Sequence, residues 1–231
     1  MNRSAGAAWL LAASGRSVRF QDASPDARAV VYAGIQADPL VARLAGLLAD
    51  ASPAQFVLAR AVMNGEATDA ATWRAMVPSC FPDDRSEAIL AASLAVADRG
   101  EQVRSQFRGA VVEALTAVLL ARRPGDAPVR RERRILFDGV RAEIHPYDVT
   151  VESPGRSEAY DCKWSARGIN ADVLHQLDDA RSHALEEDEP LTVALVVFDS
   201  RLACNVRLER QTAPHALTGL VTFETLSWLA R

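Results

Sequence analysis

The sequence predicts an α/β protein, with an all-α helical N-terminal domain over residues 1–100 and a C-terminal three-layer domain with a mixed sheet over residues 101–231. Between residues 24 and 100, apolar residues recur at three- and four-residue spacing, which is typical of amphipathic helices. Beyond Gly100 one more helix is followed by short β-rich segments, another helix and a buried strand. That order, α-β-β-β-α-β, indicates a sheet with helices packed against it.

The N-terminal half carries repeated signals for the start of a helix. Ser24-Pro25, Asp38-Pro39 and Ser52-Pro53 each place a capping residue directly before proline at the first helical position. Gly65 suits the end of the third helix, and a fourth helical segment ends in Gly100. No recognisable chemistry accompanies these helices, so we expect a module for partner binding, specificity or regulation.

The C-terminal half alternates in type. A helix is expected over 101–123, three strands within 133–140, 144–153 and 158–165, a helix over 170–188, a buried strand over 191–200, and a last strand or turn with a terminal helix over 219–231. The sequence "SPGRS" at 153–157 predicts the turn of a hairpin between the second and third strands.

Composition limits the classes of protein to consider. The net charge of -4 means that any contact with nucleic acid must come from a local patch. Three widely spaced cysteines without zinc-ligand spacing favour free thiols in a reducing cytoplasm. No run approaches the roughly 20 apolar residues that cross a bilayer, so we expect no membrane partner. The apolar run at 5–13 is weak as a signal peptide, and a first helix or strand is favoured.

Lys163 is the only lysine in the chain, in which the other 25 of the 26 basic residues are arginine. In a strand its side chain shares a face with Asp161, while Tyr160 and Cys162 lie on the opposite, core face. If the two strands form a hairpin, Asp148 comes to lie beside Asp161. Two carboxylates and one ammonium then meet on one surface.

Glu113 is a third candidate acid. It lies in the helical segment 107–121, where its sequence neighbours are apolar, so we expect it to be buried. A buried carboxylate must be paired, protonated or bound to a metal. An ion pair with Arg108, or with an arginine of 130–134, is the alternative to a functional role.

These residues resemble the PD-(D/E)XK nuclease superfamily, which has a restriction-endonuclease-like core. Pro146-Tyr147-Asp148 matches the first half of its motif, with one residue inserted, and Asp161-Cys162-Lys163 matches the second. The resemblance implies that Mg²⁺ (or Mn²⁺) is bound by Asp148, Asp161, Glu113 and the main-chain carbonyl of Cys162. It also implies that Lys163 acts on the attacking water.

Gln176 is a candidate auxiliary residue, because some members of the superfamily carry a glutamine on the following helix. The tyrosine that often follows four residues later is absent here.

The resemblance implies a metal-dependent nuclease, acting on DNA rather than RNA, in defence against foreign DNA or in DNA processing. Two alternatives stay open: a non-catalytic nucleic-acid-binding or assembly subunit that retains the fold, and a helical adaptor with an unrelated α/β domain. Arg130, Arg131, Arg133 and Arg134 are candidates for phosphate contacts, or else the charges of a solvated edge strand. A homodimer is one arrangement that would cut both strands of a duplex.

Overall fold

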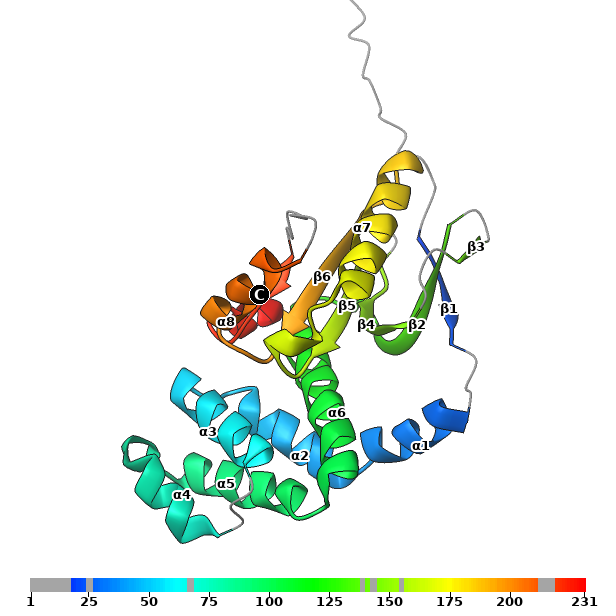
Figure 1. The fold of residues 1–231 in the computed structure, drawn as a ribbon. Coiled ribbons are helices and arrows are strands. Elements are labelled where there is room, and N and C mark those ends of the chain that lie inside the picture. Colours follow the sequence, from blue (N-terminus) through cyan, green and yellow to red (C-terminus); the bar gives the residue numbers. More distant parts are fainter. Residues whose placement is uncertain are drawn as a thin grey trace, which may run out of the picture.

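The computed structural model describes residues 18–23, 27–65, 69–137, 140–141, 145–153, 156–211 and 219–231. In this part of the chain, seven strands form one mixed sheet in the order β1-β2-β4-β5-β6-β7, with β3 paired to β2 (Figure 1). The strands are β1 (Arg19–Asp22), β2 (Val129–Phe137), β3 (Val140–Arg141), β4 (Tyr147–Val151), β5 (Ser157–Lys163), β6 (Leu191–Val197) and β7 (Leu220–Val221).

The described helices are α1 (Ala27–Gln36), α2 (Pro39–Leu48), α3 (Pro53–Asn64), α4 (Ala70–Met76), α5 (Asp84–Ala97), α6 (Glu101–Leu120), α7 (Ala171–Glu186) and α8 (Arg201–Glu209). Three short 3₁₀ helices are η1 (Pro78–Cys80), η2 (Ala166–Gly168) and η3 (Leu226–Ala230). These helices together with the mixed sheet confirm the predicted α/β class. None of the helices is long and apolar enough to cross a membrane.

The sheet is mixed because its two halves differ in strand direction. β1, β2, β4 and β5 pair antiparallel, whereas β5, β6 and β7 pair parallel. The predicted hairpin pairing of the two motif strands is thus confirmed, although Pro154 and Gly155 of its turn lie outside the described residues. β6 has a strand on each side, which explains its run of buried residues from Ala194 to Val197.

Two of the three predicted helix starts are confirmed by their caps. The Asp38 carboxylate accepts a hydrogen bond from the Leu40 N–H at 2.8 Å. Ser52 and Gln55 form a reciprocal capping box, in which each side chain accepts the other's backbone N–H. The start predicted at Ser24-Pro25 lies outside the described residues.

The N-terminal half is not all helical. β1 pairs with β2, which is consequently an internal strand between β1 and β4. The interpretation of the β2 arginines as an edge strand is therefore wrong. Helix α8 was not predicted from the sequence, although Ser200 caps it by accepting the Ala203 N–H at 3.2 Å.

Helices cover both faces of the sheet, and two apolar cores result. Val149, Tyr160 and Val196 face α6 and belong to the larger core. Ala159 and Leu195 face α7 and belong to the smaller one. Residues of α2, α3 and α5 also belong to the larger core, so the expected domains 1–100 and 101–231 share one apolar interior.

Candidate active site

The register of β4 on β5 brings the two motif aspartates together. Val149 pairs with Tyr160 and Thr150 with Ala159, so continuing the register places Asp148 opposite Asp161. At this level the Cys162 N–H donates to Asp148 Oδ2 at 2.6 Å. The Asp148 carboxylate therefore lies beside the peptide that joins Asp161 to Cys162.

On either side of Asp148, the side chains of β4 do not follow the regular alternation of a strand. Val149 packs in the larger core but Tyr147 in the smaller one, although residues two apart in a regular strand share a face. The side chains of Tyr147 and Val149 therefore lie on opposite faces of the sheet. Opposite Asp148 lies Glu132, whose φ of 52° is in the left-handed region that glutamate rarely adopts. At this irregular point of the β2–β4 pairing, the charge of Asp148 interacts with that of Glu113 on α6.

Asp161 and Lys163 form an ion pair at the end of β5. Lys163 Nζ contacts Asp161 Oδ1, which is buried and makes no hydrogen bond of ordinary geometry. The Lys163 side chain packs against Gly168 of η2, where a Cβ atom would lie 3.0 Å from both Lys163 Cβ and Cδ. The absence of a side chain at position 168 thus leaves room for the lysine.

Glu113 is buried, as predicted, with 4% of its surface exposed. Its partners come from α1: the Tyr32 hydroxyl donates to Oε1, and Gln36 Nε2 donates to Oε2 at 2.8 Å. Gln36 Nε2 also donates to Glu132 Oε1 at 3.1 Å. Arg108 instead pairs with Glu101 at 2.6 Å, so the expected pairing of Glu113 with Arg108 is wrong.

The electrostatics of the site are those of crowded carboxylates. Burial raises the pKa of Asp148 well above its usual value, and the charges of Asp161 and Glu113 raise it further. Lys163 and the Cys162 N–H oppose this rise in pKa. Burial also raises the pKa of Glu113, against the hydrogen bonds from α1.

Lys163 is held as an ammonium in this arrangement. Burial by itself would lower its pKa, but the charges of Asp161 and Asp148 outweigh burial and leave the pKa raised. Lys163 therefore carries a positive charge for as long as the two aspartates stay ionised.

The acids fit a hard divalent cation in their chemistry. Three carboxylates lie within electrostatic reach of one another, and Lys163 compensates only part of their charge. Oxygen-only ligands suit Mg²⁺ or Mn²⁺, although Asp161 Oδ1 is already in contact with Lys163 Nζ. As the side chains stand, no three Asp, Glu, His or Cys residues of the described chain are arranged to enclose a metal. Each carboxylate has a partner within the protein.

Gln176 is not brought to the carboxylates by any hydrogen bond of the described residues. Its Nε2 donates to the His145 carbonyl at 3.0 Å, and its Oε1 accepts the His145 N–H at 3.3 Å. The Tyr147 hydroxyl adds a contact to the Gln176 carbonyl at 3.3 Å. Gln176 therefore fixes the entry into β4.

The four arginines proposed for phosphate contacts have different surroundings. Arg133 pairs with Glu152 at 2.6 Å and also with Asp22. Arg131 lies near enough to Glu113 to lower the pKa of that carboxyl. Arg130 is exposed, and Arg134 interacts with Glu132. Part of the predicted positive charge is thus neutralised inside the protein.

Comparison with known proteins adds little to this picture. No family model matches the chain, and no curated protein matches it. Among solved structures, the chain is similar to protein VC1899 from Vibrio cholerae, with 16% sequence identity and a TM-score of 0.44. The match covers 93% of this chain and 57% of that one, so the chain spans little more than half the length of this neighbour.

Proposed function

We propose that the protein is a metal-dependent nuclease that hydrolyses phosphodiester bonds, with DNA as its substrate. The observation that carries this proposal is the gathering of Asp148, Asp161, Glu113 and Lys163 from two strands and a helix. A role in defence against foreign DNA or in DNA processing comes from the family resemblance.

In this proposal, the acidic residues and the lysine have different roles. Asp148, Asp161 and Glu113 would hold the ion, which when bound supplies Lewis acidity toward the phosphate and a nucleophile at neutral pH. Lys163 keeps a compact positive charge beside them, suited to orienting the attacking water and offsetting charge on the phosphate oxygens. The Cys162 N–H fixes the orientation of the Asp148 carboxylate.

A non-catalytic nucleic-acid-binding subunit is the second candidate, and one observation favours it. Both oxygens of Glu113 accept hydrogen bonds from α1, which leaves this acid less available to a cation. Direct measurement of cleavage separates the two functions.

The test is incubation of plasmid and oligonucleotide substrates with Mg²⁺, Mn²⁺ or EDTA. Wild-type protein is compared with Asp161→Ala and Lys163→Ala, and with Asp179→Asn as a control, since Asp179 is an exposed aspartate on α7. We expect metal-dependent cleavage by the wild type and the control alone. Cleavage that survives both site substitutions would contradict the assignment of the site, and no cleavage in any metal would favour the binding subunit.

A further inference from the structure

We propose that a hollow between η2 and α8 binds the sugar–phosphate backbone of a nucleic acid and leads it to the end of β5. This inference rests on the proposed function, because it names where the substrate of that site lies. The hollow has a volume of about 450 Å³ and is lined by Ala166, Arg167, Ala203, Val206, Arg207 and Arg210. We refer to it as the η2–α8 hollow.

The lining of the η2–α8 hollow carries three positive charges and no carboxylate. Arg207 Nε donates to the Ile169 carbonyl at 2.8 Å, which anchors this side chain and leaves its terminal nitrogens to other acceptors. Within the described chain, the guanidinium groups of Arg167 and Arg210 make no hydrogen bond or ion pair. In a protein with a net charge of -4, such a concentration of uncompensated positive charge suits a polyanion.

Helical spacing builds one wall of this surface. Ala203, Val206, Arg207 and Arg210 recur at three- and four-residue intervals and therefore face one side of α8 and its end. Arg167 faces them from η2, which packs against α8. The three arginines consequently come from two segments that the fold holds together.

The η2–α8 hollow is connected to the candidate active site by the short segment between Lys163 and η2. η2 begins three residues after Lys163, and the Lys163 side chain packs against Gly168 at the end of η2. A backbone phosphate held by Arg167 would thus lie on the segment that directly supports the proposed catalytic lysine. The basic surface and the candidate active site are thus linked through η2.

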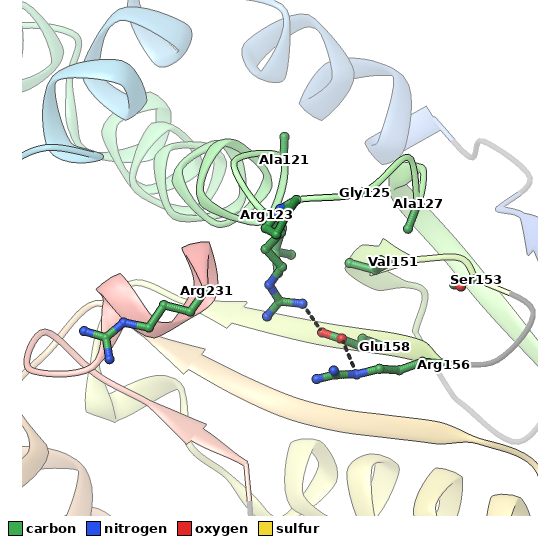
Figure 2. A pocket seen from close by; sticks show the side chains of 11 residues that line it. Ala121, Arg123, Gly125, Ala127, Val151, Ser153, Arg156, Glu158 and Arg231 are labelled. Carbon is green, nitrogen blue, oxygen red and sulfur yellow. Dashed lines mark hydrogen bonds and ion pairs between the residues drawn. The ribbon is translucent and has the colours of Figure 1, made fainter.

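A second hollow with arginines is a weaker candidate for a phosphate. It has a volume of about 320 Å³ and lies near the start of β5, where Arg123 and Arg156 both reach Glu158 (Figure 2). The Glu158 carboxylate already compensates these arginines, at 2.7 Å and 3.1 Å. Glu158 also precedes Asp161 by three residues, or about 10 Å of strand. An anion there would have to displace an existing partner and would be far from the acids.

Counterion release gives the proposal a quantitative form. Each phosphate contact made by an arginine steepens the dependence of log affinity on log salt by about 0.7 for single strands and about 0.9 for duplex DNA. Replacing Arg167 and Arg210 together should therefore make the slope shallower by about 1.4–1.8. The loss should be uniform over different sequences, because phosphates carry no base information.

The experiment measures binding of fluorescein-labelled 20-nucleotide DNA and RNA, single- and double-stranded, in EDTA over a range of salt concentrations. The Arg167→Gln/Arg210→Gln double variant and the Arg210→Gln single variant are compared with wild type. Arg43→Gln on α2 is the matched control, since Arg43 is exposed and α2 does not line the η2–α8 hollow. Thermal unfolding verifies that each variant is folded. Vesicles containing phosphatidylserine test for a membrane as the polyanion.

We expect the double variant to bind at least tenfold more weakly at low salt, with the reduced slope, while Arg43→Gln binds as wild type does. An unchanged slope in the double variant, no nucleic-acid binding by the wild type, or binding to vesicles alone would overturn the inference. Because the assay contains no metal, it is independent of cleavage. Binding through the η2–α8 hollow without cleavage in Mg²⁺ would count against the nuclease proposal only, and cleavage with an unchanged slope would count against the hollow only.

Discussion

Replacing Asp148 by asparagine should stabilise the protein in the absence of metal while abolishing cleavage. The substitution removes one of the crowded negative charges but keeps an oxygen that can accept the Cys162 N–H. Opposed residues on paired strands bring carboxylates to about 5 Å, where two charges repel by about 3 kcal/mol at an effective dielectric constant of 20. Lys163 offsets part of this repulsion. We therefore expect a gain of about 1–2 kcal/mol in the free energy of unfolding.

The gain should depend on pH with a defined sign. The pKa of Asp148 is raised in the folded protein, so the native state binds this proton more tightly than the unfolded chain does. That contribution stabilises the wild type at low pH and is lost as pH rises from about 4, the unfolded value, through the folded pKa. Asp148→Asn lacks this loss, so its advantage over wild type should widen as pH rises.

Urea unfolding in EDTA at pH 5, 7 and 9 measures this effect. Asp179→Asn, an exposed aspartate on α7, serves as the control and should differ little from wild type at each pH. A constant difference between Asp148→Asn and wild type from pH 5 to 9, or an Asp148→Asn protein less stable than wild type at pH 9, would refute the reasoning about crowded charge.

Three further predictions concern single side chains. Lys163→Arg should reduce cleavage nearly as much as Lys163→Ala, because a planar guanidinium does not fit the space beside Gly168 or replace a compact ammonium; near-normal activity of the arginine variant in the plasmid assay would contradict this. Glu158→Gln should cost about 2–3 kcal/mol by urea unfolding at pH 7, because it leaves Arg123 without its ion pair. Since the pKa of Glu158 is lowered in the folded state, that difference should shrink as pH falls below about 4, and a difference that persists in acid would show that charge is not its cause. Tyr32→Phe should cost about 1.5 kcal/mol in wild type but little in a Glu113→Ala background, which removes the acceptor oxygen; additive costs in this double-mutant cycle would exclude the coupling.

Local signals predicted much of the fold. The pairs Asp38-Pro39 and Ser52-Pro53 begin helices because capping and the fixed φ of proline act within a few residues. The apolar run of β6 predicted a buried strand because this signal, too, is contained within a few consecutive residues. β1 was not predicted, because a four-residue strand with mostly exposed side chains carries no pattern of its own.

The proximity of the two motif aspartates was predictable from the sequence, but the partners of the candidate residues were not. Asp148 and Asp161 follow from the motif and the pairing of two adjacent strands. The partners of Glu113 were not predictable, since Tyr32 and Gln36 are 81 and 77 residues away and belong to no motif. The η2–α8 hollow was missed in a similar way, because its arginines come from two segments that only the fold brings together.

The apolar interior shared by the helical half and the sheet has a practical consequence for dissecting the protein. Phe56 of α3 stacks against Phe223 and meets Phe198 edge-on, each with ring centroids 5.7 Å apart, so a cut at Gly100 would strip these aromatic contacts from the sheet. Arg60 of α3 also holds Asp199 at 2.7 Å, beside the end of β6. A fragment spanning residues 101–231 would expose this surface to water and tend to aggregate. The helical half thus contributes to the same apolar interior as the sheet and is not a detachable accessory, so truncation would report on solubility instead of on function.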